Sequence, residues 1–308
     1  MMKNIAIIGN STQDETISRE GFIEEDRRND FIGINYNSGG PAANAACVVS
    51  RFGGKVDFYG QIGNDPAGDF VYKQLQKENM NLDHLFKTDK VMTPVSHIII
   101  NTKDKTRTIN TARSLSDYIY PQIFDFKCKT GYDFILTDGK YIDDSIALIK
   151  NNENAESIID AGRPKEGIRV LCHFIDYIIC SEDFANGITN MKIDDSYENN
   201  KEVFLKMKKI YPKAKGIAIT IGPRGYICEK DSQVEIIPAY NSGLKAIDTN
   251  CAGDIFHGAF TYAIANGYKY HDSLDFANIT ASLSTTKSGG KDSCPDLNTV
   301  EKVLRKRM

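Results

Sequence analysis

An acidic residue stands where a helix is predicted to begin, in the run from Asp248 to Asp254. Apolar residues at helical spacing follow it, beginning with Ile255 and Ala259, so the helix is expected to start near Ala252. The unpaired amides and the dipole of a helix start favour a bound anion, such as a phosphate. Asp254 then has two interpretations: a general base that takes a proton from a hydroxyl attacking phosphorus, or an acid that only complements the helix dipole. The residues alone leave both open.

A second group of candidate residues lies near the N-terminus. Asp14 follows a short apolar strand predicted at residues 5–8, and an acid beyond the carboxyl end of a strand can hold ligand hydroxyls in an α/β protein. A loop or cap acid is the alternative. Further on, Gly39 and Gly40 permit close approach of the backbone, and Pro41 suits the first position of a helix that includes Asn44.

The second half of the chain alternates short apolar runs with helical stretches. The predicted strands are 134–137, 157–160, 177–180 and 217–220. This alternation predicts a parallel sheet with helices on both faces. Asp138 and the segment 160–163 end strands at the edge where α/β proteins bind ligands, and Thr220–Gly225 contains glycines that allow a tight turn past a ligand. The polar run 194–201 is expected to be a mobile surface insert.

Three of these motifs resemble, in order and spacing, those of the ribokinase-like (PfkB) family of carbohydrate and nucleoside kinases, and the resemblance covers essentially the whole chain. Asp-Thr-x-x-Ala-Gly-Asp-x-Phe, here Asp248–Phe256, is similar to the family's C-terminal signature. The resemblance implies that Asp254 is the catalytic base and that the preceding small residues form the anion hole: Cys251, Ala252 and Gly253. Cys251 departs from the pattern, which usually has Gly and sometimes Ala there.

The other two motifs imply binding residues. Gly39–Asn44 resembles the N-terminal signature, and Thr220–Gly225 resembles the nucleotide loop. The resemblance implies that the substrate is bound by Asp14, Gly39, Gly40 and Asn44, and that the nucleotide is bound by Thr220, Gly222, Gly225 and Asn278. A site for a monovalent cation such as K⁺ at Asp248 and Asn250 is a further family-level implication. The family's Asn-x-x-Glu motif is replaced by Ser181–Phe184, so its role in metal and phosphate handling is not carried over.

The resemblance also implies the fold: a three-layer α/β/α sandwich with a mainly parallel sheet and a small β-sheet lid. Residues 1–308 would form a single kinase domain, with lid segments at about 15–37 and 93–112 inserted in the α/β core. Ketohexokinases carry Ser-Arg-Thr-Ile followed by Arg-Ser-Leu, to which Thr106–Ile109 and Arg113–Leu115 are similar. Arg107 has two interpretations: a cross-strand partner of Asp104 or Glu25, or a side chain lowered onto the substrate.

The function implied is ATP-dependent phosphorylation of a hydroxyl on a small sugar, with Mg²⁺ bridging the phosphates. An unphosphorylated ketohexose such as fructose is predicted, because binding a sugar phosphate takes several converging cations and Arg107 is the one found at the matched positions. The pair Arg27-Arg28 is the exception: folded into the pocket, these two cations would bind a sugar phosphate. The alternatives are a sugar-phosphate kinase, a nucleoside (adenosine-like) kinase, and a non-catalytic sugar-binding regulator.

Composition narrows the remaining classes. The 308 residues carry a net charge of −3, which gives no electrostatic signature for nucleic acid or anionic membrane, and no apolar run approaches the ~20 residues that span a bilayer. Seven scattered cysteines without a Cys-x-x-Cys pair are typical of reduced cytosolic thiols, so a cytoplasmic location is expected. A homodimer through the lid is a further expectation. Cys251, at a helix start, is predicted to have a lowered thiol pKa.

Overall fold

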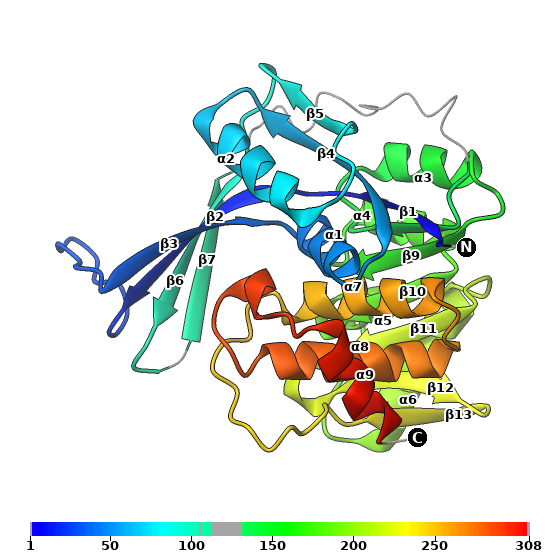
Figure 1. Cartoon of the computed structure of the whole chain (residues 1–308). Helices are drawn as coiled ribbons and strands as arrows, with labels where there is room; N and C mark the ends of the chain where they lie inside the picture. The colour runs from blue at the N-terminus through cyan, green and yellow to red at the C-terminus, as the bar shows by residue number, and fades with distance from the viewer. Residues whose placement is uncertain (1, 105, 113–130, 307–308) are drawn as a thin grey trace.

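The computed structural model describes residues 2–104, 106–112 and 131–306, and the architecture below concerns these ranges. Two sheets form the framework of the described chain (Figure 1). The larger has nine strands in the order β13-β12-β11-β10-β9-β8-β1-β4-β5, and the smaller has four in the order β3-β2-β6-β7. The segment Arg113–Leu115, used above for the ketohexokinase resemblance, lies outside the described residues.

The large sheet is parallel from β11 to β5, and β12 and β13 are added antiparallel at the other edge. Its strands are β1 (Asn4–Ile8), β4 (Lys55–Gly63), β5 (Leu85–Thr88), β8 (Phe134–Thr137), β9 (Glu156–Ala161), β10 (Tyr177–Ser181), β11 (Gly216–Thr220), β12 (Tyr226–Lys230) and β13 (Gln233–Ile237). All the strands predicted from apolar runs are present. The chain leaves β1 for β4 on one side, whereas β8 lies on the other, so the order reverses beside β1, which is where open α/β sheets bind ligands.

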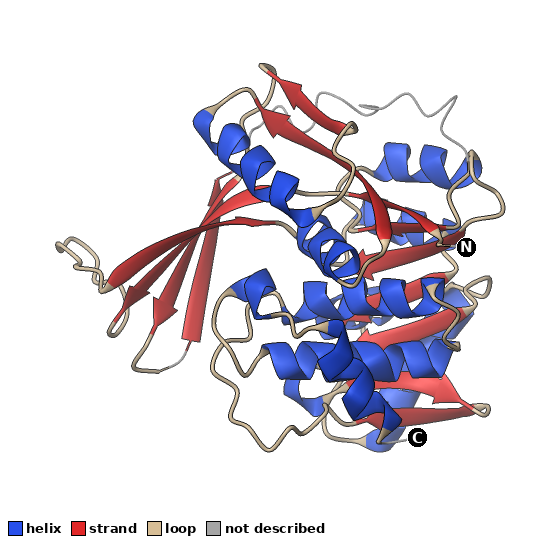
Figure 2. Cartoon of the chain, viewed as in Figure 1, coloured by secondary structure: helices blue, strands red, loops and turns tan. Residues whose placement is uncertain are grey.

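Helices cover both faces of this sheet (Figure 2). On one face lie α1 (Pro41–Arg51), α7 (Ala252–Ala265), α8 (Tyr270–Ser284) and α9 (Leu297–Arg305). On the other lie α3 (Ile142–Lys150), α4 (Glu166–Leu171), α5 (Glu182–Thr189) and α6 (Tyr197–Ile210). Alternate residues of β1 serve the two cores, since Ile5 and Ile7 pack toward α1 and α7 while Ala6 and Ile8 pack on the opposite face. The three-layer sandwich is therefore confirmed.

The small sheet projects from the body of the molecule (Figure 1). Its strands are β2 (Thr12–Arg19), β3 (Gly33–Gly39), β6 (Val95–Asn101) and β7 (Thr106–Ala112), and α2 (Pro66–Leu75) packs against β2 and β3. The second predicted lid segment, at about 93–112, contains the antiparallel pair β6–β7. The first lid segment is longer than predicted, because β2 begins at Thr12 and places Asp14 inside the small sheet.

One local prediction is wrong. The run 194–201 is expected to be a mobile surface insert, but Ser196 caps α6 by accepting a hydrogen bond from the amide of Asn199, and the helix begins at Tyr197. No helix in the described part of the chain is both long and apolar enough to cross a membrane.

Candidate active site

Two cavities meet at the start of α7. The first, about 680 Å³, lies under the small sheet and is lined by Asp14, Gly40, Asn44, Asn250 and the segment Cys251–Asp254, among others. The second, about 500 Å³, lies beside α8 and is lined by Thr220, Gly222, Gly225 and Asn278, among others. Four residues line both: Arg107, Thr249, Ala252 and Gly253. Apart from Gly39, the residues predicted for substrate and for nucleotide thus line two separate cavities that share one helix start.

The start of α7 offers main-chain donors to this junction. Cys251 is the N-cap residue in a left-handed conformation (φ 60°), and its carbonyl accepts the first helical bond from the amide of Ile255 at 2.8 Å. The amide of Ala252 makes only a long contact of 3.4 Å with the carbonyl of Thr249. The amides of Gly253 and Asp254 belong to the first turn, where no helical acceptor exists. The amides of Gly253 and Asp254 are therefore the main-chain donors available to an anion at this helix start, and the anion hole of Cys251, Ala252 and Gly253 stays a prediction.

The carboxyl of Asp254 is held from α1. Asn44, which is 2% exposed, donates from Nδ2 to Oδ2 of Asp254 at 2.7 Å and also contacts Sγ of Cys251 at 3.2 Å. Burial, with the nearby charge of Asp160, raises the pKa of Asp254 to about 7, against the lowering effects of Asn44 and His257. A carboxyl that titrates near neutrality suits a general base better than a group that only complements a helix dipole.

The prediction for the Cys251 thiol is wrong in direction. Burial, together with the charges of Asp254 and Asp14, raises its pKa well above the ordinary value, in spite of its place at a helix start. Two neighbouring carboxylates disfavour a thiolate, and the helix dipole does not compensate for them. Cys251 stands at the junction as a neutral side chain.

Asp14 lies on the face of β2 that lines the first cavity. Thr12 donates to its Oδ1 at 2.7 Å, and burial raises its pKa while Thr12 and Lys291 oppose the rise. Gly39 leaves the space that this carboxylate occupies, since a Cβ there would lie 1.9 Å from Oδ2 of Asp14. Gly40 has φ +98°, and its Cβ would lie 2.5 Å from the carbonyl oxygen of Asn10. Gly39 therefore positions Asp14 and does not itself line the cavity, whereas Gly40 does.

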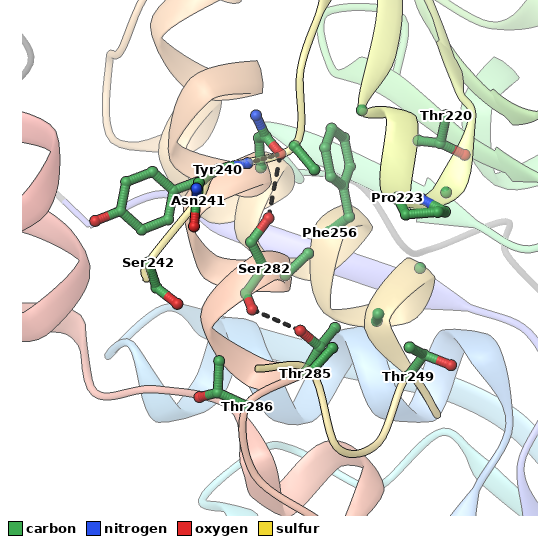
Figure 3. A pocket seen from close by; sticks show the side chains of 18 of the residues that line it. Thr220, Pro223, Tyr240, Asn241, Ser242, Thr249, Phe256, Ser282, Thr285 and Thr286 are labelled. Atoms are coloured by element: carbon green, nitrogen blue, oxygen red, sulfur yellow. Dashed lines mark hydrogen bonds between the residues drawn. The ribbon is translucent and has the colours of Figure 1, made fainter. Parts of the chain in front are cut away.

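The second cavity lies between the turn after β11 and the end of α8. In Figure 3, Thr220 and Pro223 lie on one side of Phe256, and Ser282, Thr285 and Thr286 lie on the other. Gly222 and Gly225 both have positive φ, as the predicted tight turn requires. Asn278 donates to the carbonyl of Pro238 at 2.9 Å and accepts from the amide of Tyr240 at 3.3 Å, so its amide group holds the segment that forms the cavity wall.

Arg107 reaches from β7 to the loop before α7. Its Nη1 donates to Oγ1 of Thr249 at 2.5 Å, and the side chain lines both cavities. The side chain is thus not paired with Asp104 or Glu25, and its contact with the substrate stays a prediction. At the start of the same loop, both carboxylate oxygens of Asp248 accept main-chain amides, from Asn250 at 2.8 Å and Gly289 at 3.2 Å, so Asp248 orders the loop.

Sequence reasoning missed several charged residues of the site. Arg163 and Lys165, in the loop after β9, line the first cavity. Asp160, at the end of the same strand, lies with one carboxylate oxygen 3.5 Å from Nδ1 of the buried His257, below the α7 start. The sequence predicts the segment 160–163 at the ligand-binding edge of the sheet but indicates no role for Arg163. The signal that could have found it is this position at the end of a central strand.

Comparisons with known proteins identify the family and the fold. The sequence profile of the pfkB family carbohydrate kinases matches residues 2–297. A ribokinase of Haemophilus influenzae is 24% identical to this chain, over 96% of this chain and 96% of its own length. A ribokinase of Staphylococcus aureus is also 24% identical, over 98% of this chain and 100% of its own length. Among solved structures, an Arabidopsis thaliana ribokinase complexed with ribose and ATP has a TM-score of 0.84 at 20% identity, with 99% of both chains covered. A nucleoside kinase of Methanocaldococcus jannaschii has a TM-score of 0.76 at 19% identity, also with 99% of both chains covered.

The profile match spans nearly the whole described chain, both sheets included, and contains every residue of the two cavities. The chain therefore belongs to the pfkB family and is an ATP-dependent carbohydrate kinase.

Proposed function

We propose that this site transfers the γ-phosphoryl group of ATP to a hydroxyl of a small sugar, with Asp254 as the general base. One observation carries the proposal: a single helix start, with free amides and a carboxyl of raised pKa, closes both cavities. Nucleotide in the cavity beside α8 and sugar in the cavity under the small sheet would meet there, which is the geometry that phosphoryl transfer requires.

The reaction follows from these positions. The attacking hydroxyl lies against Asp254, which accepts its proton as the new oxygen–phosphorus bond forms. The bond from γ-phosphorus to the bridging oxygen breaks, and ADP leaves with that electron pair. The amides of Gly253 and Asp254 donate to the charge that grows on the transferring group, and Arg107 lies at the same junction. Asn44 keeps the carboxyl oriented through its 2.7 Å hydrogen bond.

Mg²⁺ supplies charge neutralisation between the phosphates when it is bound. The described residues contain no cluster of three His, Cys, Asp or Glu side chains that could hold a metal ion. Glu182, which follows the first residue of the segment replacing Asn-x-x-Glu, forms an ion pair with Arg224 at 2.6 Å. We therefore propose that Mg²⁺ would be held mainly by the nucleotide phosphates and water. A K⁺ site at Asp248 and Asn250 stays a proposal on family resemblance.

The identity of the sugar is a separate matter. The ketohexose prediction depended on Arg107 as the sole cation near the substrate, and this premise fails because Arg163 and Lys165 also line the cavity. A nucleoside as acceptor is disfavoured, because the described lining of this cavity contains no aromatic side chain on which a base could stack. A non-catalytic regulator would have no need for a base held at the junction.

The assembly and location also stay proposals. Ile34 and Tyr36 lie on the face of the small sheet that is turned away from the cavity, and each is about half exposed, which suits a second copy packing on this face. Sedimentation of the wild-type chain and of Tyr36→Lys would test this, and an identical monomeric mass for both would contradict a dimer through the lid. A cytoplasmic location is retained from the cysteine pattern.

The decisive assay couples ADP release to a panel of sugars, acidic sugars and nucleosides. We expect sugar-dependent ADP formation that Asp254→Asn abolishes, while binding of ATP persists. Binding of ATP without acceptor-dependent turnover across the panel would contradict the proposed function.

A further inference from the structure

We infer that the acceptor sugar carries an acidic group, a phosphate, sulfonate or carboxylate, which Arg163 and Lys165 bind on the wall of the cavity under the small sheet. The inference rests on the proposed function and adds the substrate class. It depends on the position, anchoring and charge balance of the loop after β9.

The two cations are on the sugar side of the junction. Both line the cavity that holds Asp14 and Asn44, and neither lines the cavity beside α8. Arg107, by contrast, lines both and is the cation placed to meet the phosphates of ATP. The sugar-side cavity is also the larger of the two, at about 680 Å³ against about 500 Å³, which leaves room for a substituent on the sugar.

The loop that carries them is anchored at several points. The carbonyl of Gly162 accepts a hydrogen bond from Oγ of Ser181 at 2.7 Å, and the carbonyl of Arg163 accepts one from the amide of Lys165 at 2.8 Å. Pro164 packs against Gly187 of α5 so closely that a Cβ at Gly187 would lie 2.4 Å from the proline ring. The side chains of Arg163 and Lys165 therefore project from a backbone that is held in place before any ligand binds, which lowers the entropic cost of binding.

The charge balance of the cavity leaves Arg163 without an acid. The two acids that line the cavity already have neighbours that stabilise their negative charge. These are Thr12 and Lys291 for Asp14, and Asn44 and His257 for Asp254. Among the residues that the structure describes, no side chain forms a hydrogen bond or an ion pair with the guanidinium of Arg163. Arg163 is exposed and solvated by water in the free protein, so its guanidinium is available to pair with an acidic group in the planar two-bond geometry that guanidinium favours.

The test compares matched neutral and acidic sugars with the full-length enzyme. The pairs are fructose with fructose 1-phosphate and fructose 6-phosphate, ribose with ribose 5-phosphate, and glucose with gluconate, in the ADP-release assay at fixed ionic strength. We expect one acidic member to exceed its neutral counterpart in kcat/KM. Arg163→Gln and Lys165→Gln should each raise the KM for that substrate roughly 10- to 100-fold, the range for a hydrogen bond to a charged group, with the KM for ATP within about twofold.

Arg169→Gln is the matched control, because Arg169 lies on the adjoining helix α4, contacts Glu166 and lines neither cavity. Its kinetics should equal those of the wild type. A neutral sugar preferred over its acidic derivatives, with KM unchanged in Arg163→Gln, would overturn the inference and leave the kinase proposal intact. A rise confined to the KM for ATP would overturn it too, by assigning the cations to the nucleotide. If no sugar of any pair is phosphorylated, the proposed function is contradicted, and thermal shifts then test the anion subsite separately. Fructose 6-phosphate should raise the Tm of the wild type and not that of Arg163→Gln. Equal shifts in Tm would refute the subsite.

Discussion

Replacing the candidate base should lower activity and increase stability together. Asp254→Asn keeps the size of the side chain and the contact with Asn44 but removes the proton acceptor, so kcat should fall by roughly 10²–10⁴. The same change removes a carboxylate that the fold ionises at a cost. Burial and the charge of Asp160 raise the pKa of Asp254 from 3.8 to about 7, and each unit of pKa corresponds to about 1.4 kcal/mol. The variant should therefore be more stable at pH 8 by at most about 4 kcal/mol.

The pH dependence fixes the sign of this effect. Between pH 4 and 7 the folded wild type binds a proton at Asp254 that the unfolded chain has already lost, so this group lowers the free energy of unfolding as the pH rises. Below pH 4 both states hold the proton and the cost vanishes. The difference in Tm between Asp254→Asn and wild type should hence be largest at pH 8 and shrink steadily toward pH 4.5.

A control of opposite sign is available at Asp65, the N-cap of α2. Burial raises the pKa of Asp65, but the amides of Thr93 and Gly68 outweigh it and the pKa is lowered overall. Asp65→Asn should therefore lose stability at pH 8, where its carboxylate is ionised and hydrogen-bonded. Wild-type turnover in Asp254→Asn would refute its role as base. A variant less stable than wild type at pH 8 would refute the electrostatic reasoning.

Three further experiments test the pKa of Asp254, the reactivity of Cys251 and the turn at Gly225. Asn44→Leu removes a hydrogen bond that lowers the pKa of Asp254, so the acid limb of kcat, expected near pH 7 in the wild type, should move up by about one to two pH units; an unmoved limb would contradict this. Cys251 should react with iodoacetamide at pH 8 more slowly than a cysteine in an unfolded peptide, because burial raises its pKa, and faster reaction would count against the raised pKa. Gly225→Ala should raise the KM for ATP and lower Tm, since its Cβ would lie 1.9 Å from a main-chain oxygen of β13. Gly243→Ala, also at positive φ but in open space, should lower Tm less, and an equal loss of Tm in the two variants would exclude the clash as the cause.

Local patterns were enough to predict much of the fold. The helix start at Ala252 and the strand at Phe134–Thr137 match the structure to the residue, because apolar periodicity and runs of apolar residues report burial directly. The start of α6 was missed, since polar residues dominate it and its signal is a single capping serine, Ser196. The beginning of β2 was missed for a similar reason: its face toward the cavity is polar, so Asp14 gave no strand pattern.

The site was predictable where a motif names its residues and unpredictable where the fold assembles it. Asp254 and Asn44 lie 210 positions apart yet share a hydrogen bond, and both belong to recognised motifs. Arg163 belongs to none, and its place beside the α7 start depends on the position of β9 in the sheet. The pKa of Cys251 was predicted in the wrong direction because the sequence shows the helix start but neither the burial of the thiol nor the two carboxylates near it.

The close packing of α1 against α7 has a consequence for how the site can change over evolution. Gly258 permits this contact, since a Cβ there would lie 2.6 Å from the carbonyl oxygen of Ala45, and both helices begin on the wall of the same cavity. Each helix start contributes roughly half a positive elementary charge. This part of the field comes from the main chain, so no exchange of side chains within the cavity removes it. Side chains that select the sugar can diverge freely while the attraction for anions, on which phosphoryl transfer depends, is retained.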